Sequence, residues 1–208
     1  MQILSVSKHE KKPGKFTVTF NAGTEIDVST EQIADFGLYS GKELTDDEYS
    51  ELIGKLREGS SKARAVRILG TRNLSAREIK KRLVNKGDSD ETAQSTVEWL
   101  QDIGAINDAE YAVSIAKHYS GKGYGEARIR DELFRRGIPR ELWDDALLGI
   151  AGAEDAAQYY LEKKFRGSYD REDLRKAADM LCRRGYSYED ARAAVLKYAE
   201  NIQENSEE

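Results

Sequence analysis

The segment Leu133-Phe134-Arg135-Arg136-Gly137 occurs in related form at three places along this chain. The other two copies are Leu83-Val84-Asn85-Lys86-Gly87 and Leu181-Cys182-Arg183-Arg184-Gly185. Their glycines are 50 and 48 residues apart in the numbering. A period of this size is typical of repeat arrays, in which each unit needs its neighbours to bury its apolar face. Such arrays present an extended surface to another macromolecule, so the pattern favours a binding protein.

Each copy has the features of a helix C-terminus. An apolar residue lies four positions before each leucine on the same helical face, and basic side chains in the last turn complement the helix dipole. Glycine adopts the positive φ with which many helices end. Apolar periodicity before and after each copy predicts two more helices, so each unit is expected to contain three. The predicted helix starts are Ser75-x-x-Glu78, Pro139 and Ser187-x-x-Asp190.

The N-terminal part of the chain has a different pattern. Short β-branched or aromatic segments, separated by Pro13-Gly14 and by residues 21–23, predict a small β-meander followed by a helix. Gly59-Ser60-Ser61 is expected to form a short joint into the array. The predicted fold class is therefore mainly α: a tandem array of three three-helix repeats, forming an elongated curved molecule, with a small N-terminal β-meander plus helix. The predicted divisions are an N-terminal extension at 1–59, repeats at 60–106, 107–150 and 151–200, and an acidic tail at 201–208.

Composition limits the class of protein. The chain has 208 residues, of which 34% are charged, and a net charge of -5. No apolar run approaches the roughly 20 residues of a transmembrane helix, and the N-terminus lacks a signal-peptide pattern. We therefore expect a cytoplasmic protein without membrane contact, and the single cysteine, Cys182, is in keeping with a reducing compartment. Net acidity argues against a protein that works mainly on DNA phosphates.

Basic residues are nevertheless concentrated on the predicted second helices. Arg128 and Arg135 lie within about 20° of each other on one flank of the second helix in unit two, at 100° per residue. Lys176 and Arg183 occupy the equivalent positions in unit three, whereas unit one lacks such a pair. Two interpretations stay open: a partner-binding face, or a solvated helix surface. The residues predicted to bind the partner are Arg72, Arg77, Lys80, Lys81, Lys86, Arg128, Arg130, Arg135, Arg136, Lys176, Arg183 and Arg184.

The sequence contains no recognisable catalytic pattern. His9 and His118 lack cysteine or acidic neighbours at the spacing of metal ligands. The glycine-rich segment 121–125 links two predicted helices instead of following a strand, so we interpret it as a turn and not as a phosphate-binding loop. We expect a protein that is not an enzyme, requires no cofactor and binds no metal.

One segment in the second unit is close to a family signature: Lys122-Gly123-Tyr124-Gly125-x-Ala127-Arg128-Ile129-Arg130-x-Glu132-Leu133-x-x-x-Gly137-Ile138. Supporting segments are Arg64-Ala65-Val66-Arg67-Ile68-Leu69 with Arg72, Ser75, Ile79 and Leu83, then Ile106-Asn107-Asp108-x-x-Tyr111-Ala112, and finally Arg184-Gly185-Tyr186. From about residue 60 to residue 200, the chain resembles the RecX family, the bacterial regulators of the RecA recombinase. Residues 1–59 resemble, more loosely, an extension found in some members.

The resemblance implies a protein that lies in the helical groove of the RecA–single-stranded DNA filament and bridges neighbouring protomers. It would inhibit ATP hydrolysis and strand exchange and limit filament extension, with a role in recombinational DNA repair and the SOS response. We expect a monomer whose own contact with single- or double-stranded DNA is weak. One alternative is a direct DNA-binding protein, because three-helix units resemble helix-turn-helix modules. Another is a scaffold for some other acidic helical protein.

Overall fold

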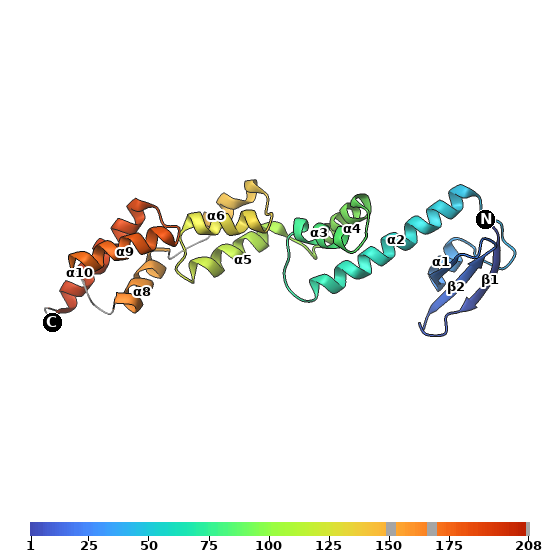
Figure 1. Cartoon of the computed structure of the whole chain (residues 1–208), viewed down its shortest axis with the longest axis horizontal. Helices are drawn as coiled ribbons and strands as arrows, with labels where there is room; N and C mark the ends of the chain where they lie inside the picture. Colours follow the sequence, from blue (N-terminus) through green and yellow to red (C-terminus); the bar gives the residue numbers. More distant parts are fainter. Residues whose placement is uncertain (149–152, 166–169, 207–208) are drawn as a thin grey trace.

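The structure is a computed structural model that describes residues 1–148, 153–165 and 170–206. These residues form an elongated molecule, with a small β-sheet at one end and successive groups of helices along the long axis (Figure 1). The last helix lies at the end opposite the sheet. The fold class predicted from the sequence, a mainly helical elongated array with an N-terminal β-meander, is confirmed.

An antiparallel three-stranded sheet in the order β1-β2-β3 forms the N-terminal module. Its strands, and the helix that follows them, are β1 (Ile3–Lys8), β2 (Lys15–Phe20), β3 (Glu25–Ser29) and α1 (Thr30–Asp35). Alternate strand residues face a buried core, as expected for a sheet with one solvated face. That core comprises Ile3, Val18, Phe20, Val28, Leu38, Leu44 and Leu52. The predicted meander is therefore confirmed.

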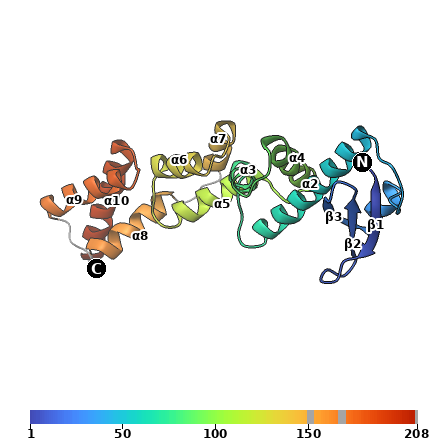
Figure 2. The same ribbon diagram turned by 45° about the vertical axis from the view of Figure 1, so that its right-hand side comes forward.

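Helix α2 (Asp46–Leu69) connects the sheet to the first three-helix unit without a break (Figure 2). It begins at a capping box, in which the side chains of Thr45 and Glu48 each accept a hydrogen bond from the backbone N–H of the other residue. Leu52 packs in the core of the N-terminal module, and Ala65 packs in the core of the first unit. One helix thus contributes to two separate cores.

The prediction of a joint at Gly59-Ser60-Ser61 is wrong, because these residues lie inside α2. Glycine in a helix interior costs only about 1 kcal/mol relative to alanine, and packing can offset such a penalty. Ser61 supplies that packing. It is fully buried, its hydroxyl donates to Oδ2 of Asp88 at 3.1 Å, and the hydroxyl oxygen of Thr96 is 2.9 Å away.

Replacing Gly59 with alanine is expected to stabilise the protein by about 0.5–1 kcal/mol, because glycine loses more backbone freedom in a helix than alanine does. Gly59 is exposed, and an added Cβ would have no other atom within 4 Å. Thermal melts of the parent and the Gly59→Ala variant measure the effect. A lower melting temperature in the variant would contradict a continuous helix at this position.

Three groups of helices follow the N-terminal module, and each has its own core. The end of α2 packs with α3 and α4, α5 packs with α6 and α7, and α8 packs with α9 and α10 (Figure 2). Leu83, Leu133 and Leu181 are fully buried in the three cores, as the repeat pattern predicts. The bounds are α3 (Ala76–Asn85), α4 (Asp90–Asp102), α5 (Asp108–Ser120), α6 (Glu126–Arg135), η1 (Arg140–Leu142), α7 (Trp143–Leu148), α8 (Ala153–Phe165), α9 (Arg171–Arg183) and α10 (Tyr188–Ser206).

Most helix ends lie where the sequence predicts them. Gly87, Gly137 and Gly185 follow α3, α6 and α9 with φ of 96°, 70° and 94°, which confirms their predicted role. Pro139 precedes the short 3-10 helix η1 and not α7 itself. Residues 201–206 of the segment expected to be an acidic tail continue helix α10, while residues 207–208 and the expected boundary at 150–151 lie outside the described residues.

Candidate partner-binding surface

The first junction between units joins the start of α3 to the end of α6. The hydroxyl of Ser75 donates to the carbonyl oxygen of Arg136 at 2.5 Å, and the N–H of Ala76 donates to Oδ1 of Asp108 at 2.9 Å. Burial raises the pKa of the Asp108 carboxyl above its ordinary value, although the hydrogen bond from Ala76 opposes this shift. Gly137 lies against Arg77, because a Cβ added to Gly137 would be 2.3 Å from Cδ of Arg77.

The second junction joins the start of α6 to the end of α9 in the same manner. The N–H of Gly125 donates to the carbonyl oxygen of Arg184 at 3.0 Å, and the N–H of Ala127 donates to that of Gly185 at 3.0 Å. A Cβ added to Gly185 would be 2.5 Å from the backbone nitrogen of Arg128. At both junctions, therefore, the second helix of one unit ends against the first turn of the second helix in the unit before it.

Arg184, predicted as a partner contact, is engaged inside the second junction. Its guanidinium donates to the carbonyl oxygen of Gly123 at 2.8 Å and to that of Lys122. The guanidinium carbon also lies 4.2 Å from the ring centroid of Tyr124 and 4.0 Å from that of Tyr160. Arg184 therefore fastens the α5–α6 turn to the third unit, and we leave it out of the candidate surface.

Arg136 is engaged in a similar way within the second unit. Its guanidinium donates to Oε1 of Glu132 at 2.7 Å and to the hydroxyl of Tyr111. Glu132 is almost fully buried, which by itself would raise its pKa, but the hydrogen bond and charge of Arg136 bring that pKa below its ordinary value. Removing Arg136 would leave a buried carboxylate without its main partner, so we assign Arg136 a structural role as well.

Four further predicted contacts form ion pairs on the surface of the chain. Arg72 lies 3.5 Å from Glu78, and Lys80 lies 2.9 Å from Asp90. Arg130 lies 2.7 Å from Glu126 and 2.8 Å from Asp144, while Lys176 lies 2.9 Å from Glu172 and 3.7 Å from Asp173. Exposed pairs of this kind are typically worth no more than about 1 kcal/mol, so these cations can exchange their partners for another acidic surface.

The six remaining predicted contacts are exposed: Arg77, Lys81, Lys86, Arg128, Arg135 and Arg183. Among the side chains that the structure describes, only Arg135 of these six forms an ion pair, at 3.6 Å from Glu132. The Arg135 side chain is still 67% exposed. These six residues are therefore the cations best placed to meet a partner.

Four of the six lie at a junction glycine or within two positions of one, and we name them the junction arginines: Arg77, Arg128, Arg135 and Arg183. Arg77 contacts Gly137, two positions after Arg135, and Arg128 contacts Gly185, two positions after Arg183. Each junction thus combines an arginine of the earlier unit that contacts the glycine with an exposed arginine of the later unit two positions before that glycine. Helical periodicity in the sequence instead pairs Arg128 with Arg135 along one helix and gives unit one no such pair.

The part of the chain that the structure describes contains neither a cluster of metal-binding side chains nor a membrane-spanning helix. No group of three or more His, Cys, Asp or Glu residues is placed there to hold a metal ion. In the same residues, no helix is both long and apolar enough to cross a membrane.

Fold and surface together define a helical repeat protein whose exposed basic side chains recur at the junctions between units. Known proteins identify the family. The model of the second three-helix domain of RecX matches residues 107–147, and the model of the third matches residues 153–195. The chain is 32% identical over 144 residues to Regulatory protein RecX of Xanthomonas axonopodis pv. citri (strain 306), covering 68% of this chain and 89% of that protein. It belongs to the RecX family.

Other relatives and solved structures agree. Regulatory protein RecX of Stenotrophomonas maltophilia (strain R551-3) is 32% identical over 142 residues, which cover 67% of this chain and 87% of that protein. A crystal structure of regulatory protein RecX aligns with 96% of this chain and 98% of its own, with a TM-score of 0.72 at 19% identity. RecX from Lactobacillus salivarius aligns with 68% of this chain and 96% of its own, with a TM-score of 0.63 at 21% identity. These two likenesses concern the fold alone.

Proposed function

We propose that this chain regulates RecA by binding along the RecA–single-stranded DNA filament, where it limits ATP hydrolysis, strand exchange and filament extension. In this proposal the protein acts as a cytoplasmic monomer and is not an enzyme. Membership of the RecX family supports a regulatory role. The partner and the mode of binding are our inference from the surface described above.

The recurrence of the junction arginines along an elongated array carries the proposal. A filament of identical protomers presents the same surface again and again along its axis. A rigid ligand with several equivalent basic sites can contact neighbouring protomers at once, and linked contacts raise the overall affinity far above that of one site. Bridging of this kind would also oppose the movements between protomers on which turnover depends.

The charge of the whole chain supports a protein-coated filament over bare DNA. At a net charge of -5, the protein is repelled at long range by naked phosphates, whereas local basic groups can still pair with acidic side chains at short range. Exposed charges of this type chiefly change the rate of association and its dependence on salt. We therefore expect the junction arginines to act together, with a small effect from each one alone.

Reversing the charge at the second junction, with Arg128→Glu and Arg183→Glu, is expected to raise the concentration needed to inhibit RecA ATP hydrolysis by about tenfold or more, equivalent to about 1.4 kcal/mol or more. The two introduced glutamates would repel the acidic groups of the filament with which, in this proposal, Arg128 and Arg183 pair. The measurement is RecA ATP hydrolysis on single-stranded DNA against the concentration of parent or variant. Circular dichroism checks that the variant remains folded.

A matched control reverses Lys8 and Lys11, two exposed lysines of the N-terminal module, and should inhibit like the parent. Equal inhibition by the Arg128→Glu/Arg183→Glu variant and the parent would contradict a role for the second junction. The direct DNA-binding alternative has its own result, which is parent protein that binds bare DNA as tightly as it binds the filament and loses affinity steeply with salt.

A further inference from the structure

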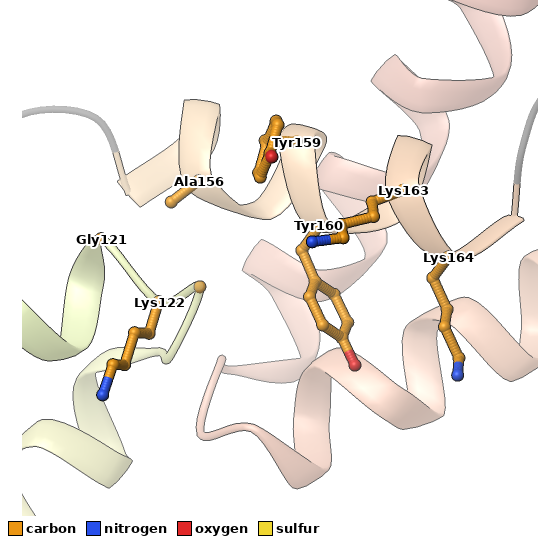
Figure 3. A pocket seen from close by; sticks show the side chains of 8 residues that line it. Gly121, Lys122, Ala156, Tyr159, Tyr160, Lys163 and Lys164 are labelled. Atoms are coloured by element: carbon orange, nitrogen blue, oxygen red, sulfur yellow. The ribbon is translucent and has the colours of Figure 1, made fainter.

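A cavity of about 510 Å³ lies between the α5–α6 turn and helix α8, beside the second junction (Figure 3). Its charged and aromatic lining consists of Lys122 from the turn and Tyr159, Tyr160, Lys163 and Lys164 from α8. The other lining residues are two glycines of the turn and an alanine of α8, and none of the eight carries a carboxylate. The volume is in the range of small-ligand sites, about 300–1,000 Å³.

The three lysines line the cavity together with the two tyrosines. Among the described side chains, none of the three forms an ion pair. In Figure 3, Lys122 and Lys164 lie on opposite sides of Tyr160, and the side chain of Lys163 extends toward the start of the Tyr160 side chain. Because three lysines and no carboxylate line the cavity, an anion in it would be attracted from more than one side.

The two tyrosines have different environments. Tyr160 has the guanidinium of Arg184 4.0 Å from its ring centroid, and its hydroxyl lies 3.4 Å from the sulfur of Met180, so this ring is held in place. Tyr159 is 66% exposed and is therefore free to accept a flat group on its ring. Exposed aromatic rings next to lysines are the elements with which proteins bind single-stranded nucleic acid, by stacking on bases and by pairing with phosphates.

We propose that this cavity is a binding site for single-stranded nucleic acid, in which a base stacks on Tyr159 while Lys122, Lys163 and Lys164 contact the phosphates. A paired duplex does not offer the face of an unstacked base to Tyr159. The lysines are spread over two structural elements, which suits successive phosphates of a strand better than the compact phosphate group of a free nucleotide. The site rests on the proposed function only in that a RecA filament supplies such a strand.

The test measures binding of a fluorescein-labelled oligothymidylate of about 15 nucleotides, a length within the usual range for such sites. Fluorescence anisotropy is recorded over a series of salt concentrations with the full-length protein. Changing Lys122, Lys163 and Lys164 together to alanine should weaken binding at low salt at least tenfold. Because each phosphate contact on a single strand contributes about 0.7 to the slope of log affinity against log salt, the slope should fall by about 2.

Tyr159→Ala should weaken binding roughly 5- to 150-fold, the range for a lost base stack, and should leave the salt slope unchanged. Tyr159→Phe should bind like the parent. The matched control changes Lys8, Lys11 and Lys55 to alanine, which alters the net charge equally at exposed positions outside the cavity. This control should retain both the affinity and the slope of the parent.

Three results would overturn the site: parent protein that does not bind the oligonucleotide at low salt, a triple cavity variant that keeps the affinity and slope of the parent, or thymidine monophosphate that competes as well as oligothymidylate per nucleotide. RecA inhibition is measured separately on the same proteins. A parent that fails to inhibit RecA contradicts the proposed function, whereas unchanged oligonucleotide binding by the cavity variant contradicts the site alone.

Discussion

Leu133→Ala should lower the free energy of unfolding of the second unit by about 2–5 kcal/mol, the range for truncating a fully buried leucine. The Leu133 side chain has no exposed surface and lies in the core with Ile129 and Ile138. That core is small, and the chain is an array of such cores, so neighbouring units cannot compensate for the lost contacts. Chemical denaturation followed by circular dichroism, together with hydrogen exchange of the amides in α5 and α6, measures the loss.

Phe134 provides the matched control, because it is the next residue on the same helix and is 60% exposed. Phe134→Ala should change stability by no more than about 0.5 kcal/mol, as is usual for surface positions. If Leu133→Ala and Phe134→Ala had equal effects, the repeated leucine would have no special role in packing.

Gly125→Ala should destabilise the contact between the second and third units by roughly 1–3 kcal/mol, the usual cost of an added methyl group where space is lacking. Gly125 has φ -79° and ψ 172°, which alanine adopts without strain, so the effect would be purely steric. The new Cβ would be 2.3 Å from the backbone nitrogen of Tyr186. Because backbone atoms cannot move aside as a side chain can, the end of α9 must retreat from the start of α6.

Hydrogen exchange of the Gly125 and Ala127 amides tests this directly, since both donate across the junction in the parent. Both should exchange faster when residue 125 is alanine, while the amides inside the cores of the two units keep their protection. Gly59→Ala introduces the same methyl group where nothing lies within 4 Å, so it should leave these two amides unchanged. Unaltered protection in Gly125→Ala would contradict the close approach at the junction.

Features that depend on neighbouring residues in sequence could be predicted without the structure. The glycine ends of α3, α6 and α9 and the capping box of Ser75 with Glu78 follow from backbone chemistry within a few residues. The predictions from sequence were wrong where segments that are distant in the chain contact each other. Ser61 is buried and hydrogen-bonded with Asp88 and Thr96, which are distant in sequence, and such contacts help α2 to continue through Gly59.

The residues of the candidate surface could likewise be predicted only in part from the sequence. Sequence periodicity places arginines on a helix but does not reveal which of them face a neighbouring unit. Arg184 and Arg136 look like ordinary surface cations in the sequence, yet Arg184 binds backbone carbonyls across the junction and Arg136 binds Glu132 and Tyr111. The signal that could have grouped the junction arginines is the repeated glycine, whose missing Cβ permits the close approach of another helix.

The meeting of helix ends at the two junctions also gives the chain an electrical polarity. A helix carries partial positive charge at its start and partial negative charge at its end, and each junction brings an end against a start. At the extremities of this series the compensating charge comes from side chains: Glu172 and Asp173 in the first turn of α9, and Arg82 in the last turn of α3. The helix ends inside the series keep such charges as well, with Glu78 and Glu126 in the first turns of α3 and α6 and Arg135 in the last turn of α6. Lengthening the series by another unit would therefore depend on the close approach that Gly137 and Gly185 permit, and not on removing the terminal charges.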